Sequence, residues 1–263
     1  MSRFSTFFSA QLNYRRWLAP ALLALAVAGC KDDVEKAAPI DTSYYPMQVG
    51  DFRIYEVTDT TWLRNNRNIV RYQVRERVEE QYLDATNKTT SFRVVRASRS
   101  TPADAWRDDS VLVVSPAVAN VQVTRNNRRT VELVYPARTG YFWDQNAFNA
   151  AGTTNNPNTS NRDGDIHYKR VGEAFTTTTA AGEVKTYPKT VMTALRETNA
   201  ENGGIYINPF YYFRLRQVYA SGIGPVYRSR RRFIYTENGG MTPSPDYIFS
   251  GMARTEILLE SGR

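Results

Sequence analysis

Residues 70–82 alternate between apolar and polar side chains, and this pattern limits the fold of the chain more than any other feature. The apolar positions are Val70, Tyr72, Val74 and Val78. The polar positions between them are Arg71, Gln73, Arg75, Arg77 and Glu79. Successive side chains of a β-strand point to opposite faces, so this period of two predicts a half-buried antiparallel strand.

Strand-like segments recur along the chain, which is rich in the aromatic residues that favour strands, with 17 tyrosines and 12 phenylalanines. The expected strands are 51–62, 70–82, 91–97, 111–114, 121–123, 130–135, 166–171, 186–195, 205–219, 226–235 and 255–259. A turn at Asn126-Asn127 would join 121–123 to 130–135 as a hairpin. Two polar segments without periodicity, 150–165 and 176–179, are expected to be loops. The pattern predicts an all-β fold with a single antiparallel, strongly bent or barrel-like sheet, and a β-sandwich is the alternative.

The N-terminus combines a basic start, an apolar stretch and the only cysteine of the chain. Three arginines and no acidic residue precede the apolar segment 17–29, which ends in Val27-Ala28-Gly29 and is followed directly by Cys30. This arrangement resembles the signal peptide and lipobox of bacterial lipoproteins. The resemblance implies cleavage before Cys30 and a lipid on its sulfur; a plain signal peptide with a chance cysteine is the alternative. We expect 1–29 to be a signal peptide, 30–43 a lipidated cysteine with a flexible tether, and 44–263 a single all-β domain.

The residues after Cys30 resemble a second sorting signal. Lys31-Asp32-Asp33-Val34-Glu35-Lys36 is similar to the lysine-plus-acidic export tag of Bacteroidetes surface lipoproteins. In that family the tag directs export to the outer face of the outer membrane. The resemblance therefore implies a lipid-anchored protein at the cell surface, with Lys31, Asp32 and Asp33 in the export signal. The alternative is a periplasm-facing orientation, in which the segment is only a polar tether.

Two short blocks of the body resemble recurring blocks of uncharacterised Bacteroidetes lipoproteins. They are Tyr45-Pro46 with Gly50-Asp51-Phe52, and Gly222-Ile223-Gly224-Pro225-Val226. This resemblance implies an all-β fold and no known activity. On physical grounds, Gly222 and Gly224 relieve a tight entry into the strand that begins near Val226.

The charge balance is mildly basic. Basic residues exceed acidic ones by 8 in the whole chain and by 5 once residues 1–29 are removed. Most of the excess is scattered arginine, and no nucleic-acid-binding motif is present, so nucleic acid is not an expected partner. Because Cys30 is the only cysteine, the domain is expected to fold without a disulfide.

Signals for catalysis and metal binding are weak. His167 is the only histidine and no serine lies in a Gly-x-Ser-x-Gly motif, so neither a histidine–cysteine zinc site nor a hydrolase elbow is predicted. Asn161, Asp163 and Asp165 alternate as calcium ligands often do, but their register does not fit an EF-hand, and an Asx-rich turn is the alternative. The acidic candidates for a glycosidase pair are Glu79, Glu80, Asp108, Asp109 and Glu132. We expect no catalytic residue, metal or cofactor, and a hydrolase is a disfavoured alternative.

Two groups of residues are candidates for ligand binding: the aromatic Trp143 and Tyr211, and the arginines Arg228 and Arg230. Exposed aromatic rings stack on sugars, and a row of arginines binds anionic polysaccharide or phosphate. The alternatives are core packing for the rings and a solvated sheet face for the arginines.

The arginine row depends on strand pairing. On a strand, Arg228, Arg230 and Arg232 point the same way, and a hairpin with 205–219 is expected to place Arg214 and Arg216 beside them. The leading expectation is a non-enzymatic β domain that binds an envelope or extracellular component, such as a glycan or an envelope protein. The alternative is a carrier or chaperone for lipids or lipoproteins, with an apolar cavity inside a bent sheet.

Overall fold

The computed structural model describes residues 40–84, 88–148, 165–195, 204–208, 210–235 and 246–263, and no helix occurs among them. The strands are β1 (Phe52–Leu63), β2 (Asn66–Leu83), β3 (Thr90–Arg99), β4 (Arg107–Pro116), β5 (Asn120–Arg125), β6 (Arg128–Val134), β7 (Phe142–Asp144), β8 (Asp165–Thr178), β9 (Val184–Leu195), β10 (Gly204–Asn208), β11 (Tyr211–Ala220), β12 (Gly224–Tyr235) and β13 (Ile248–Gly262). Within these residues, nothing helical has the length and apolarity needed to cross a membrane.

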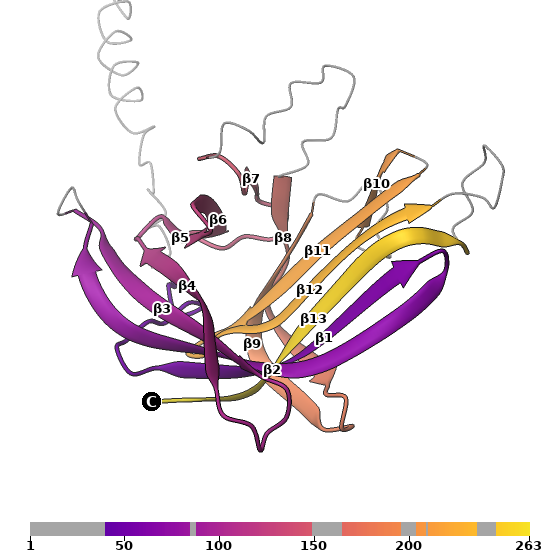
Figure 1. The fold of residues 1–263 in the computed structure, drawn as a ribbon. Coiled ribbons are helices and arrows are strands. Elements are labelled where there is room, and N and C mark those ends of the chain that lie inside the picture. Colours follow the sequence, from indigo (N-terminus) through magenta and orange to yellow (C-terminus); the bar gives the residue numbers. More distant parts are fainter. Residues whose placement is uncertain (1–39, 85–87, 149–164, 196–203, 209, 236–245) are drawn as a thin grey trace, which may run out of the picture. The chain divides into compact units, whose positions relative to one another are not determined.

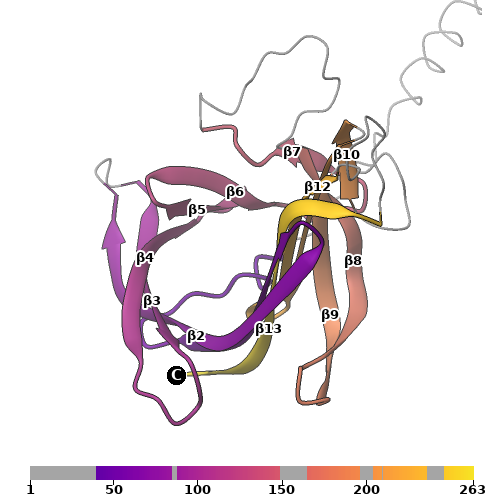
Figure 2. The same cartoon turned by 45° about the vertical axis from the view of Figure 1, so that its right-hand side comes forward.

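All strands belong to one antiparallel sheet. Its order is β6-β5-β4-β3-β2-β1-β13-β12-β11-β9-β8-β7, and β10 pairs with β11 off this path (Figure 1). Figure 2 shows the sheet curling round until β5 and β6 approach the β7–β8 side, so that the barrel is nearly closed. The predicted all-β, strongly bent sheet is confirmed, and the alternative of two packed sheets is wrong.

The two ends of the strand order meet at a seam between β6 and the β7–β8 hairpin. The backbone N–H of Val131 donates to the carbonyl of Gln145 at 3.0 Å. The indole Nε1 of Trp143 donates to the carbonyl of Val131 at 2.9 Å. The hydroxyl of Tyr168 donates to the carbonyl of Val134 at 2.7 Å and accepts from its N–H at 3.0 Å. The backbone groups of Val131 and Val134 on the edge strand β6 are thereby satisfied and are not open to pairing with another chain.

Tight turns join the strands that the sequence predicted to be hairpins. Asn126 and Asn127 both have positive φ, and Arg125 pairs with Arg128 across them, which is the geometry of a two-residue hairpin. The hairpin predicted at this position is confirmed. The polar run at 176–179 was expected to be a loop, but Thr176–Thr178 belong to β8 and pair with β9, because β-branched threonine favours a strand. The other expected loop, 150–165, lies outside the described residues except for Asp165.

The start of β12 is built around a buried arginine. Arg53 donates from its guanidinium to the carbonyls of Ile223 and Pro46, each at 2.8 Å. Gly224 has φ +97° and a Cβ there would lie 3.0 Å from the Arg53 guanidinium, so only glycine fits. This close approach explains the tight entry that the sequence predicted ahead of Val226.

The segment before β1 contacts the domain, and residues 40–263 form one compact unit. Ser43 Oγ lies 2.7 Å from Ser221 Oγ, and Asp41 forms a 2.9 Å ion pair with Lys189. Tyr44 and Tyr45 are buried in the core. Residues 41–43, which the sequence assigned to the tether, therefore contact the turn after β11 and strand β9.

Side chains that point into the barrel are of two kinds. One region is apolar and includes Val94, Leu112, Val123, Leu133 and Tyr219. The other region is charged, because strands β2, β6 and β13 carry glutamates at inward positions. On β2, Glu76 is only 3% exposed and lies between the buried Val74 and Val78.

Candidate functional site: an arginine-rich pocket in the barrel

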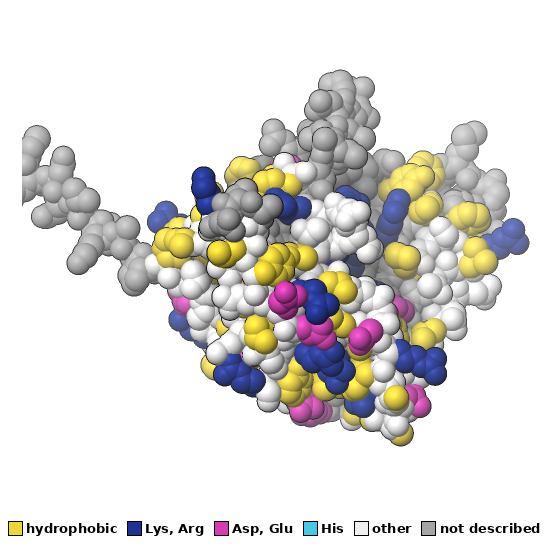
Figure 3. All heavy atoms as spheres, turned by 60° about the vertical axis from the view of Figure 1, so that its left-hand side comes forward, with side chains coloured by type: hydrophobic (Ala, Val, Ile, Leu, Met, Phe, Trp, Pro, Cys, Tyr) yellow, Lys and Arg dark blue, Asp and Glu magenta, His cyan; other side chains and the backbone are white. Residues whose placement is uncertain are grey.

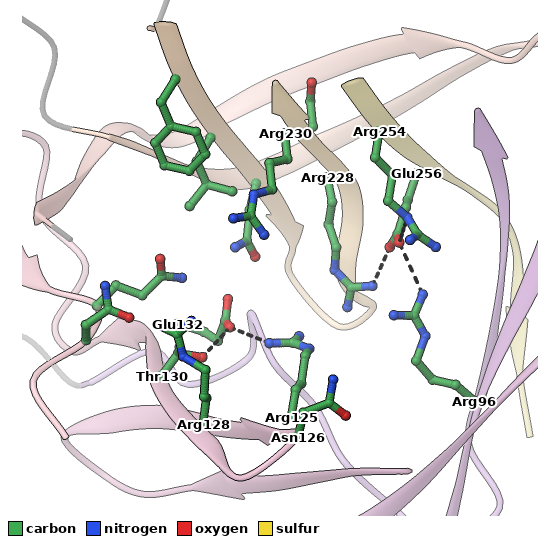
Figure 4. Close-up of a pocket in the computed structure, with 16 residues that line it drawn as sticks. Arg96, Arg125, Asn126, Arg128, Thr130, Glu132, Arg228, Arg230, Arg254 and Glu256 are labelled. Carbon is green, nitrogen blue, oxygen red and sulfur yellow. Dashed lines mark hydrogen bonds and ion pairs between the residues drawn. The ribbon is translucent and has the colours of Figure 1, made fainter. Parts of the chain in front are cut away.

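A pocket of about 450 Å³ opens inside the barrel, between β3, the β5–β6 hairpin and the central strands β11–β13 (Figure 4). Most of the residues that line it have polar or charged side chains; they are Arg96, Arg125, Asn126, Arg128, Thr130, Glu132, Gln145, Asn146, Phe213, Leu215, Gln217, Arg228, Ser229, Arg230, Arg254 and Glu256. Six of these side chains are arginines and two are glutamates. The pocket is therefore a basic site rather than an apolar cavity.

Strand register decides which arginines enter the pocket. Arg228 pairs with Glu256 of β13 and Gln217 of β11, and directly paired residues share a face of the sheet. Arg230 likewise pairs with Arg254 and Leu215. The predicted row on β12 is thus present, and its first two members line the pocket.

The prediction that Arg214 and Arg216 lie beside this row is wrong. The hairpin between β11 and β12 forms, but Arg214 pairs with Arg231 and Arg216 with Ser229. Both arginines consequently share the face of Arg231, opposite to that of Arg228. A shift of one residue in register exchanges the two faces of a strand, and the sequence alone did not define this register.

At the floor of the pocket, a chain of ion pairs holds Arg228 between two glutamates. Its Nη1 lies 2.8 Å from Glu76 Oε1 and 2.9 Å from Glu256 Oε2. Arg96 reaches Glu256 at 3.1 Å from the β3 side. Arg254 also contacts Glu256 at 3.1 Å. Each arginine of this floor therefore has a carboxylate partner.

The floor carboxylates are held in their ionised form. Burial raises the pKa of Glu76, but Arg228 and Arg96 outweigh it, and the pKa falls from 4.5 to about 2. The pKa of Glu256 is also lowered, because Arg228, Arg96 and Arg254 outweigh the effect of burial. Burial lowers the pKa of Arg228, but Glu76, Tyr55 and Glu256 raise it well above its usual value. Both partners of the buried pair thus stay charged at neutral pH.

A second buried pair forms the β5–β6 wall. Glu132 is 2% exposed and its carboxylate lies 2.8 Å from Arg125 Nη1. Thr130 Oγ1 and Tyr219 Oη donate to the same carboxylate at 2.9 and 3.1 Å. Burial raises the pKa of Glu132, but Arg125 and the hydrogen bond from Thr130 lower it below its usual range.

The mouth of the pocket differs from the floor, because Arg128 and Arg230 have no carboxylate partner among the residues that the structure describes. Arg230 lies over the ring of Phe213, with its guanidinium carbon 5.4 Å from the ring centroid. Partial burial, followed by repulsion from Arg232 and Arg128, lowers the pKa of Arg230. Figure 4 shows Arg128 and Arg230 on opposite walls of the same opening.

The charges around the pocket do not cancel. Arg96, Arg125 and Arg228 pair with the three buried glutamates, and Arg254 also contacts Asp59 at 3.7 Å. Four carboxylates thus face four arginines, which leaves Arg128 and Arg230 as the surplus. The outer surface is different: Arg93 lies 2.9 Å from Glu79 and 3.2 Å from Glu80. Figure 3 shows basic, acidic and hydrophobic side chains interspersed on one outer face (Figure 3).

The two aromatic candidates have different positions. Trp143 is 9% exposed, packs on Tyr168 with ring centroids 4.8 Å apart, and holds the seam instead of lining the pocket. Tyr211 lies on the pocket face of β11, two residues beyond Phe213, and is 39% exposed. Tyr211 is therefore at the rim of the site, and Trp143 belongs to the closure of the barrel.

The remaining sequence candidates fall outside the pocket or outside the described residues. His167 lies in β8, opposite Phe142 and Ala194, and Asp165 is buried at the start of the same strand. No group of three metal-ligating side chains is present in the described part of the chain. Of the acidic candidates, only Glu132 reaches the pocket. The residues that are not described are Cys30, Lys31, Asp32, Asp33, Asn161 and Asp163.

Sequence reasoning missed the two floor glutamates, Glu76 and Glu256. A signal for Glu76 was present, because it interrupts the apolar face of Val74 and Val78 at an inward position. A buried carboxylate at such a position needs a cationic partner. That partner, Arg228, is 152 residues away, and only the folded sheet brings the two together.

No protein-family model and no curated protein matches the chain. Among solved structures, the chain is similar to a candidate lipoprotein from Parabacteroides distasonis. The two are 10% identical with a TM-score of 0.38, over 83% of this chain and 98% of the other. At this level of similarity, neither fold nor function is transferred between the two proteins.

Proposed function

We propose that the chain is a non-enzymatic, lipid-anchored protein whose barrel pocket binds an anionic ligand from the envelope or the extracellular medium. The observation that carries the proposal is that Arg128 and Arg230, at the mouth of the pocket, have no carboxylate partner in the described part of the chain, whereas the other arginines of the pocket do. A ligand that brings negative charge between them would remove their repulsion.

The chemistry of the lining favours a carboxylate, phosphate or sulfate group. Guanidinium is planar and always charged, and it binds these groups through two parallel hydrogen bonds. The paired floor fixes Arg228 and Arg96 and leaves the mouth arginines available. The amides of Asn126, Gln145 and Asn146 also line the opening and can donate to polar groups of a ligand.

The same lining disfavours the two alternative functions. A wholly apolar ligand would strip water from several charged groups without replacing it, which is costly. A glycosidase needs one carboxyl group that stays protonated near neutral pH. In contrast, the pKa values of Glu132 and Glu256 are both lowered.

Isothermal titration at low ionic strength tests the proposal, with inorganic phosphate and glucuronate as probes. A charge-assisted hydrogen bond contributes about 1.5–3 kcal/mol, so the double variant Arg128→Gln/Arg230→Gln should bind at least about tenfold more weakly. Arg231→Gln is the control, because it replaces an arginine on the opposite face of β12, next to Arg230 in the chain. Equal affinity in all three proteins, or no binding of either anion, would contradict the proposal.

The proposed anchor rests on the sequence around Cys30. We infer an outer-membrane protein held by a lipid on Cys30 and displayed at the cell surface, with the periplasmic face as the alternative orientation. Cys30→Ser should release the protein from the membrane fraction. Asp32→Ala with Asp33→Ala should abolish antibody labelling of intact cells while the total amount of protein persists. A cleaved Cys30→Ser protein that stays in the membrane would refute the anchor, and unchanged labelling would reduce Lys31, Asp32 and Asp33 to a tether.

A further inference from the structure

The pocket face of the sheet continues beyond the mouth arginines as a surface of exposed apolar side chains. Figure 1 shows the ends of β1, β2, β12 and β13 extending together past the barrel wall. The exposed apolar side chains on these strand ends include Leu63, Val70 and Met252, and Tyr211 is exposed at the adjoining end of β11. We call these four residues the apolar shelf.

Strand register places the apolar shelf on the same face as the arginines. Met252 pairs with Arg232, one step along β12 from the pair formed by Arg254 and Arg230. Val70 pairs with Asp59, which in turn pairs with Arg254. Because paired residues share a face, Val70 lies in the same row as Arg254 and Arg230, on the third strand from Arg230, and Met252 lies one row beyond that pair.

The second row beyond Arg230 contains the other two shelf residues, Leu63 and Tyr211. Leu63 pairs with Ser250, Ser250 with Ile234, and Ile234 with Tyr211. Alternate residues of a strand are about 7 Å apart, so the two rows extend about 13 Å from Arg230. The shelf therefore adjoins the pocket lining through Met252, next to Arg254, and through Tyr211, next to Phe213, with the exposed Arg232 between these two sides. It is long enough to support an extended hydrocarbon chain.

The exposure of these side chains is not explained by the packing of the domain. Leu63 is 65% exposed, Met252 is 55% exposed and Val70 is 50% exposed. Single exposed apolar residues are ordinary, but a group that continues a binding pocket marks a surface for an apolar partner. Met252 lies one row from the pair of Arg254 and Arg230, and Leu63 and Tyr211 lie two rows from it.

We propose that the ligand of the pocket is an anionic amphiphile, with a phosphate or carboxylate head between Arg128 and Arg230 and a hydrocarbon chain along the apolar shelf. This inference rests on the proposed anion-binding function and adds the class of ligand. Charge complementarity fixes the head at the mouth, and the position of the shelf beside the pocket lining fixes the direction of the chain. Aliphatic Leu63, Val70 and Met252 suit a hydrocarbon chain better than the hydroxyl groups of an acidic sugar.

Four probes that separate head from chain test the inference by titration below the critical micelle concentration. Dodecyl phosphate carries both parts, methyl phosphate only the head, dodecyl maltoside the chain with a neutral head, and glucose 6-phosphate the head on a polar body. Burying two methylenes is worth about tenfold in affinity, so dodecyl phosphate should bind at least about tenfold more tightly than the other three. Dodecanoate in place of dodecyl phosphate shows which of the two heads is preferred.

A matched pair of variants locates the chain. Val70→Ser with Met252→Ser should weaken dodecyl phosphate several-fold and leave methyl phosphate unchanged. Ile69→Ser is the control, because Ile69 is also exposed and adjoins Val70, but it pairs with Thr60 on the opposite face. These residues are exposed, so their replacement should leave folding intact.

The outcomes distinguish this inference from the function on which it rests. Methyl phosphate binding as tightly as dodecyl phosphate, or glucose 6-phosphate binding more tightly, would overturn the amphiphile and leave the anion pocket standing. Equal affinities for dodecyl maltoside and dodecyl phosphate would show that the charged head does not contribute to binding. This result would also overturn the inference of an anionic amphiphile. Failure of every phosphate to bind would overturn the anion pocket itself.

Discussion

The floor and the mouth of the pocket use the same side chain in opposite ways. At the floor, Arg228 is enclosed by Glu76 and Glu256, and the charges neutralise one another. At the mouth, Arg128 and Arg230 repel each other and face the opening. The contrast separates arginines that hold the barrel together from arginines that are available to a ligand.

The floor should therefore dominate stability. Glu76→Gln removes one buried carboxylate and leaves Arg228, Arg96 and Arg254 to share Glu256, so one buried positive charge loses its compensation. We therefore expect a loss of about 3–5 kcal/mol in the free energy of unfolding. Urea denaturation measures this loss. The control is Glu79→Gln on the outer face of the same strand, where an exposed pair contributes under about 1 kcal/mol. Similar losses in both variants would remove the distinction between a buried floor and a solvated surface.

The floor carboxylate Glu76 should also make the free energy of unfolding depend on pH. The pKa of Glu76 is about 2 in the folded protein and 4.5 is its ordinary value, so the unfolded chain binds more protons between these pH values. Stability is then fully present above about pH 4.5 and falls as the pH drops towards 2. At about 1.4 kcal/mol for each pH unit, Glu76 alone accounts for about 3 kcal/mol.

Thermal unfolding between pH 7 and pH 2.5 checks this dependence. The unfolding temperature of Glu76→Gln should fall less steeply with decreasing pH than that of the wild type, because the glutamine at position 76 does not titrate. Superimposable profiles would show that Glu76 is not held ionised by Arg228 and Arg96.

The mouth should contribute little to stability, or oppose it. Arg128→Gln with Arg230→Gln removes two like charges that no described carboxylate balances, so the free energy of unfolding should stay within about 1 kcal/mol of the wild type or rise. The same chemical denaturation measures this change. A loss as large as that of Glu76→Gln would mean that the mouth arginines are structural, and the comparison with the floor would fail.

Much of the fold could be predicted from the sequence, because its signals are local. Alternation in 70–82 identified a half-buried strand, and Asn126-Asn127 identified a hairpin. The seam could not be predicted in this way. Trp143 was a candidate for sugar binding, but its indole donates a hydrogen bond to the carbonyl of Val131 at the seam of the barrel. Val131 lies on β6 and Trp143 on β7, at opposite ends of the strand order.

The site was predictable only in part, because charge pairs depend on register. Arg228 and Arg230 were selected correctly as neighbours on one face, but their surroundings were not. The sequence placed Arg214 and Arg216 beside them, and the sheet instead places Gln217 and Leu215 there. Of the two partners of Arg228, Glu256 lies on the next strand, 28 residues away, but Glu76 lies 152 residues away, and no local pattern encodes that contact.

The central claim is that an anion binds between Arg128 and Arg230, and anomalous diffraction tests it most directly. Crystals of the protein soaked in selenate, which carries the geometry of sulfate and an anomalous scatterer, should show a selenium peak within hydrogen-bond distance of both guanidinium groups. Crystals of Arg128→Gln/Arg230→Gln should lack this peak, and those of Arg231→Gln should keep it. A wild-type pocket without a selenium peak, or a peak that persists in the double variant, would contradict the account.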